Sequence, residues 1–182
     1  MKKWLNRLFI DGLSGMATGL FSTLIVGTII QQIGTLIGGT VGNYLFFFGK
    51  MAAAMTGAGI GCGVACKFKE SPLVVLSAAT TGMVGAIAGK ILAGQVLVEG
   101  SIVLTGPGEP LGAFIAAYVG IELGHLIAGK TKLDIGLTPI VCIIAGSVVG
   151  LIFSPPISAF MNSLGALINW GTEQQPFLMG II

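Results

Sequence analysis

The chain has 182 residues and a mass of 18.5 kDa, which is enough for one domain. Hydrophobic residues make up 54% of it and charged residues only 9%, with a mean hydropathy of +0.97 and a formal net charge of +2. Soluble domains carry roughly 25% charged residues, so the composition excludes a soluble enzyme, a disordered tail and a nucleic-acid-binding protein with a basic surface. We therefore expect lipid to surround most of the chain.

Five apolar segments are long enough to cross the hydrocarbon core, which takes about 20 helical residues. They are Leu13–Ile37, Asn43–Cys66, Pro72–Leu92, Pro110–Ala128 and Ile135–Phe153. The first follows a basic start but exceeds the roughly 7 to 15 apolar residues of a cleaved signal peptide, so we expect it to be retained. The predicted fold is an all-α integral membrane protein, a polytopic bundle of about five transmembrane helices.

Basic residues indicate the orientation of these segments. They gather before the first segment, between the second and third, and between the fourth and fifth, as Lys2, Lys3, Arg7, Lys67, Lys69, Lys130 and Lys132. Alternate connections lie on the same side of the bilayer, and positively charged short loops stay in the cytoplasm. We expect a cytoplasmic N-terminus.

Two segments differ from ordinary spans. Residues 95–98 and 101–105 are β-branched, apolar runs on either side of Glu99-Gly100, which indicates a small β-hairpin after the third span. Ser154-Pro155-Pro156 is expected to end the fifth helix. Ile157–Trp170 is helical in character but too short and too polar for a span, so we expect an interfacial or re-entrant helix there.

Thirty glycines suit helices that pack inside a membrane, because small residues let backbones approach closely. Nearly every span carries a GxxxG pair, which predicts a compact bundle. The pairs are Gly15/Gly19, Gly57/Gly61, Gly59/Gly63, Gly85/Gly89, Gly120/Gly124 and Gly146/Gly150.

Residues 124–131 match the G-x-x-x-x-G-K-[ST] pattern of a phosphate-binding loop. That chemistry needs free backbone amides at a strand-to-helix turn, whereas Gly124 lies inside a predicted helix whose amides are already bonded. We therefore interpret the segment as a helix end followed by cytoplasmic lysines. One histidine and no metal-binding cluster predict no cofactor, no metal and no catalytic residue.

Glu122 and His125 are three residues apart on the fourth span and therefore share one helix face. Ionisable side chains at membrane depth are costly and need partners. Two interpretations remain open: a proton- or ligand-sensitive pair that lines a cavity, and a structural hydrogen bond near the cytoplasmic rim.

Near the C-terminus, polar and aromatic side chains gather between two apolar segments. They are Asn169, Trp170, Thr172, Glu173 and Gln175. Amides and carboxylates bind the hydroxyls of sugars, and an aromatic face packs on the C–H surface of a sugar ring. A tryptophan in the interfacial belt is the alternative interpretation of Trp170.

Several motifs resemble the enzyme IIC-like membrane family, which is related to the sugar-translocating component of the bacterial phosphotransferase system. The motifs are Pro-Leu-Gly-Ala-Phe-Ile-Ala at 110–116, Gly-Lys-Thr-Lys-x-Asp at 129–134, Thr138-Pro139, Pro-Pro-Ile-x-x-Phe at 155–160 and Asn-Trp-x-Thr-Glu-x-Gln-Pro-Phe-Leu-Met-Gly at 169–180. The resemblance implies that Glu173, in the Thr172-Glu173 pair, contacts a sugar. It also implies that residues 1–182 form a single membrane domain, the N-terminal portion of a longer protein.

The resemblance implies a multi-pass permease of the bacterial inner (plasma) membrane that binds or moves a small polar solute such as a sugar. Phosphate would come from a separate IIB-type phosphocarrier partner, and we expect a homo-oligomer that binds no nucleic acid. Because the family includes members described as toxin-expression regulators, the alternative is a non-transporting membrane regulator or sensor that acts through a protein partner.

Overall fold

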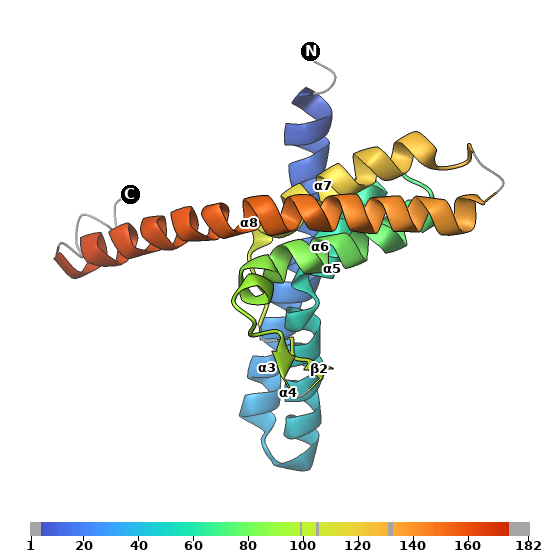
Figure 1. The fold of residues 1–182 in the computed structure, drawn as a ribbon. Coiled ribbons are helices and arrows are strands. Elements are labelled where there is room, and N and C mark those ends of the chain that lie inside the picture. The colour runs from blue at the N-terminus through green and yellow to red at the C-terminus, as the bar shows by residue number, and fades with distance from the viewer. Residues whose placement is uncertain (1–4, 99, 105, 131–132, 175–182) are drawn as a thin grey trace.

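The structure is a computed structural model that describes residues 5–98, 100–104, 106–130 and 133–174. Helices make up nearly all of it (Figure 1). In chain order the elements are η1 (Arg7–Gly12), α2 (Leu13–Leu20), η2 (Phe21–Ile25), α3 (Val26–Ile37), α4 (Gly39–Ala54), α5 (Thr56–Lys67), α6 (Pro72–Leu92), β1 (Leu97–Val98), β2 (Ser101–Ile102), α7 (Pro110–Ile127) and α8 (Asp134–Gln174).

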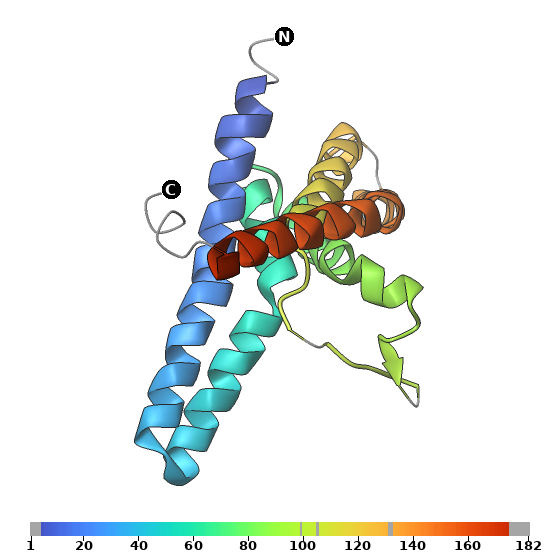
Figure 2. The ribbon, with the colours of Figure 1, turned by 90° about the vertical axis from the view of Figure 1, so that its left-hand side faces the viewer.

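The first four elements form one helix of 31 residues, from Arg7 to Ile37. At 1.5 Å per residue it is about 46 Å long, so it exceeds the roughly 30 Å of the hydrocarbon core. Gly38 and Gly39 then reverse the chain with φ angles of 65° and 62°, a conformation that glycine adopts without steric cost. As a result α3 and α4 form an antiparallel hairpin that projects from the rest of the molecule (Figures 1 and 2).

The second predicted span is a broken helix. Helices α4 and α5 meet at Met55, and their axes are bent by 56°. The hydroxyl of Thr56 donates to the carbonyl of Ala53 over 2.6 Å, which satisfies one backbone acceptor at the break. The bend turns α5 away from the hairpin, so that it packs on both α2 and α6.

Helices α6, α7 and α8 form the other part of the bundle, with α7 antiparallel to its two neighbours (Figure 1). Where two helices touch, glycines of one helix face the backbone of the other. A Cβ at Gly15 or Gly19 on α2 would overlap the backbone of α5 at Gly63 or Gly59. The predicted role of these two GxxxG pairs is therefore confirmed. Gly89, by contrast, has open space at its Cβ position, so the α6 pair makes contact only at Gly85.

Between α6 and α7 the chain forms a short antiparallel pairing. Leu97 lies opposite Ile102, and the two strands have two residues each. The backbone N–H of Val103 also donates to the carbonyl of Val96 over 2.8 Å.

The expected end of a helix at Ser154-Pro155-Pro156 is wrong. Helix α8 continues through both prolines to Gln174, over 41 residues and about 60 Å. Each proline removes one backbone donor, but its fixed φ near −65° is helical. Each proline also leaves the carbonyl four residues earlier without its helical donor. Away from water the helix still pairs the remaining backbone groups, so continuing it costs less than unwinding it. No separate interfacial helix therefore begins at Ile157.

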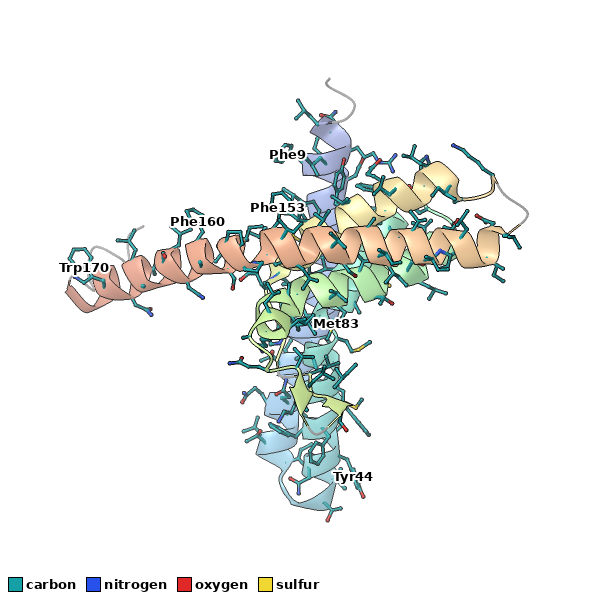
Figure 3. The ribbon with its side chains drawn as sticks, in the orientation of Figure 1. Phe9, Tyr44, Met83, Phe153, Phe160 and Trp170 are labelled. Carbon is teal, nitrogen blue, oxygen red and sulfur yellow. The ribbon has the colours of Figure 1, made fainter. Side chains whose placement is uncertain are left out.

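Large apolar side chains cover the outside of the helices, as Figure 3 shows for Phe153, Phe160 and Trp170 along α8. Four described helices are long and apolar enough to span a membrane, or up to five if α4 and α5 count as one bent span. The predicted multi-pass, all-α membrane fold is confirmed.

Candidate functional site

Four ionisable side chains from three segments meet at one end of α7, and we call them the charge cluster: Arg7, Glu70, Glu122 and His125. Arg7 Nη2 lies 2.8 Å from Glu70 Oε1, and Arg7 Nε lies 3.1 Å from Glu122 Oε1. His125 Nδ1 lies 2.8 Å from Glu70 Oε2. One carboxylate, Glu70, therefore joins the N-terminal helix to α7.

The sequence correctly placed Glu122 and His125 on one face of α7, but they are not each other's partners. Glu122 pairs with Arg7, and His125 pairs with Glu70. Sequence reasoning missed both partners because they are distant in the chain. Glu70 did carry a signal, since it is an acidic residue directly after Lys67 and Lys69 in a positively charged loop.

The turn after α5 positions Glu70. Lys69 adopts a φ of 57°, in the left-handed region that a non-glycine residue rarely occupies. The N–H of Lys69 donates to the carbonyl of Cys66, and the N–H of Glu70 donates to that of Ala65. This pair of bonds is a Schellman motif, which ends the helix and turns the chain back across it. The carboxylate of Glu70 is thereby directed into the bundle, where its side chain is only 4% exposed.

Arg7 is held on three sides. Besides the two carboxylates, the ring of Phe68 lies beneath its guanidinium, with the centroid 4.4 Å from Cζ. A cation over an aromatic face gains electrostatic attraction. Arginine suits this position because its planar group binds two carboxylates and stacks on a ring at once.

The charge cluster ties three segments together: the N-terminal helix, the loop after α5, and α7. These contacts agree with the structural interpretation of the Glu122 and His125 face. The proton- or ligand-sensitive interpretation stays a prediction.

The second group of predicted site residues lies at the other end of α8. Asn169 and Trp170 are exposed on its last turns, where Figure 3 shows Trp170 far out along the helix. The backbone of Thr172 and Glu173 belongs to α8, but the described part of the structure does not include their side chains, and Gln175 lies outside the described residues.

These two groups are not brought together. Asp134 accepts a hydrogen bond from the N–H of Gly129, so α8 begins close to the end of α7 that carries His125. Trp170 follows Asp134 by about 54 Å of helical rise. The C-terminal polar residues and the charge cluster are therefore separate features.

Comparison with known proteins assigns a family. Residues 10–182 match the family model described as "Phosphotransferase system, EIIC". No curated protein and no solved structure matches the chain.

Proposed function

We propose, on the premise that this chain belongs to the phosphotransferase system EIIC family, that it binds a small polar solute such as a sugar and moves it across the bacterial inner membrane. The observation that carries the proposal is the extent of the family match, which covers residues 10–182 and therefore all of the candidate spans except the first three residues of the first one. A permease component of this system works with IIB components. In this proposal a IIB-type phosphocarrier supplies the phosphate.

The C-terminal polar residues supply the solute contacts in this proposal. Glu173 accepts hydrogen bonds from solute hydroxyls, and Thr172 assists it. Asn169 and Gln175 donate and accept through their amides, while the exposed ring of Trp170 packs against the apolar face of the solute. Glu122 and His125 act at a distance, by holding the N-terminal helix in place through the charge cluster.

Uptake measurements test the proposal. Cells that express the chain take up labelled sugars, and Glu173→Gln lowers the apparent affinity about 10- to 100-fold, because a hydrogen bond to a charged group is worth roughly 1.5–3 kcal/mol. Asp11→Asn is the matched control, since it removes an exposed carboxylate from the N-terminal helix. Uptake that Glu173→Gln leaves unchanged removes this residue from the site.

The positively charged loops support a cytoplasmic N-terminus in this membrane. In a background without the three native cysteines, Lys69→Cys is expected to stay unlabelled by an impermeant thiol reagent added to intact cells. Thr40→Cys, beyond the turn at the far end of the first long helix, is expected to label. The reverse pattern would overturn the orientation.

The charge cluster favours a second candidate function, a membrane regulator that senses a ligand or a proton. Its ionisable groups join three segments near the predicted cytoplasmic face, so a change of charge there can alter a surface that a partner contacts. Affinity purification from membranes separates the candidates: a co-purified IIB protein supports the permease, and a co-purified transcription regulator supports the sensor. Light scattering of the purified chain in detergent tests the proposed homo-oligomer.

A further inference from the structure

A groove that contains two cysteines opens between the first long helix and α5. It has a volume of about 480 Å³, with the helix turns around residues 18–23 on one side and one face of α5 on the other. Cys62, Cys66 and Lys67 all line it on the α5 side. Both thiols are free, and Cys66 is exposed while Cys62 is half-buried. The groove therefore offers two accessible sulfur atoms beside one ammonium group.

The spacing of the two cysteines brings their side chains together. Residues four apart on a helix share a face, with Cβ atoms about 5–6 Å apart. A disulfide needs Cβ atoms about 3.5–4.5 Å apart, so Cys62 and Cys66 do not bond directly unless α5 is distorted. An ion held by both sulfurs inserts two metal–sulfur bonds of about 2.3 Å, which spans the wider separation. The pair therefore suits a bridging ion better than a disulfide.

The two sulfur atoms can turn toward each other. Cys62 Sγ lies 3.8 Å from the carbonyl oxygen of Val75 on α6, and a thiol is only a weak hydrogen-bond donor. Rotation of the Cys62 side chain to another staggered position carries its sulfur away from α6 and toward Cys66. Because Cys66 is exposed, its thiol can turn without displacing a buried neighbour.

The other groups of the groove limit the number of ligands. The hydroxyls of Thr18, Ser22 and Thr23 already donate to carbonyls of their own helix, and hydroxyl oxygens are poor ligands for a soft ion. No group of three or more His, Cys, Asp or Glu in the described ranges could hold a metal ion. The prediction of no metal rested on the lack of such a cluster, which excludes a tetrahedral zinc site but leaves an ion that takes two ligands.

Softness and charge then select the ion. Thiolates prefer soft ions such as Cu(I), which is stable with two sulfur ligands. Two thiolates and one Cu(I) leave one negative charge, which the ammonium of Lys67 on the same groove balances. A divalent ion would leave a net positive charge beside apolar helices, where an unbalanced charge is costly. The groove therefore favours a monovalent ion.

We propose that Cys62 and Cys66 bind one Cu(I) ion as two thiolates, with Lys67 balancing the charge. Each thiol releases its proton as its sulfur bonds to the ion. The copper arrives and remains as Cu(I), so no electron is transferred. The site does not depend on the permease function, and the bound ion would link two successive turns of α5 beside the first long helix.

Competition for Cu(I) tests the site, with the purified full chain in detergent, without oxygen, against the coloured chelator bicinchoninate. We expect one Cu(I) per chain. Cys62→Ala and Cys66→Ala should each lower the affinity at least about 100-fold, since losing a group that only orients a ligand already costs about 10- to 100-fold. Lys67→Gln should lower it about 2- to 5-fold, since an exposed charge contributes little.

Cys142→Ala is the matched control. It leaves two thiols in the chain, as the other two cysteine variants do, but Cys142 is fully buried and lies against Thr81 where α8 meets α6. The affinity for Cu(I) should stay unchanged in this variant. X-ray absorption of the copper-loaded wild type provides a measurement that needs no variant, and it should show two sulfur neighbours around the metal.

Several results would overturn the proposal. They are an affinity too low to compete with the chelator, one Cu(I) per two chains, a preference for Zn(II), or a loss in Cys142→Ala as large as that in Cys66→Ala. If Cys142→Ala does not elute and melt as the wild type does, the absorption spectrum decides. Two sulfur neighbours then support the site, and a nitrogen or oxygen neighbour contradicts it.

Discussion

Glu70→Gln tests whether the charge cluster holds the bundle together. The wild-type carboxylate is 4% exposed and accepts hydrogen bonds from Arg7 and His125, both at 2.8 Å. Glutamine keeps the shape but removes the charge and turns an N–H₂ group toward one of these two donors. We therefore expect the variant to lose stability even though its volume is unchanged.

The magnitude follows from burial. A hydrogen bond to a charged group contributes roughly 1.5–3 kcal/mol. The partners are partly solvated, however, with side chains 32% exposed for Arg7 and 54% for His125. Taking the low end, we expect a loss of about 2 kcal/mol in the free energy of unfolding, which corresponds to about 4–8 °C in melting temperature for a chain of this length.

The assay is thermal melting of the purified protein in detergent, with Glu122→Gln as the internal comparison. Glu122 is 33% exposed and contacts Arg7 without a hydrogen bond of good geometry, so its replacement should cost at most about 1 kcal/mol. Asp11→Asn, which alters an exposed carboxylate, should cost nothing measurable. A Glu70→Gln protein that melts with the wild type, or no lower than Glu122→Gln, would refute the structural role of the cluster.

Four further substitutions probe helix packing and hydrogen bonding. Gly19→Val should destabilise the protein by at least about 3 kcal/mol, because a Cβ at this position meets the backbone of Gly59. Gly165→Ala should be neutral or stabilise α8 by up to about 1 kcal/mol, because the space around its Cβ position is open. Equal melting temperatures of the two variants would contradict the packing. Pro156→Ala should raise the melting temperature, because it restores a backbone donor inside α8, and a fall would show that the proline is needed. Thr81→Val should change stability by less than about 1 kcal/mol, since the carbonyls of Ser77 and Cys142 that its hydroxyl contacts keep their backbone bonds within α6 and α8. A larger loss of stability in chemical denaturation would contradict this.

Several features of the fold follow from local properties of the chain. The third and fourth spans, predicted as Pro72–Leu92 and Pro110–Ala128, match α6 and α7 to within one residue. Ser71 and Glu109 precede these helices and cap them, and a proline follows each cap. Length, hydropathy and capping all act within about 20 residues, so the sequence alone contains them.

Other features were decided by contacts between distant segments. The bend at Met55 is not visible in the hydropathy of residues 43–66, because it depends on α5 packing against α2 and α6. The sequence predicts a helix end at Pro155-Pro156, but α8 continues through both prolines because of its surroundings. Where water is absent, a helix with two missing donors has a lower free energy than an unwound backbone.

The candidate sites also combine features that the sequence alone determined with features that contacts between distant segments decided. The sequence alone determined that the chain belongs in lipid, which residues are apolar enough to span it, and that Glu122 and His125 share a face. Only the tertiary structure gave those two residues their partners. Glu122 pairs with Arg7 at the start of the chain, and His125 meets Glu70, which is 55 positions away, at 2.8 Å. It also placed the first long helix and α5 on the two sides of one groove. A charge finds its partner through space, and spacing along the chain does not encode which helices lie side by side.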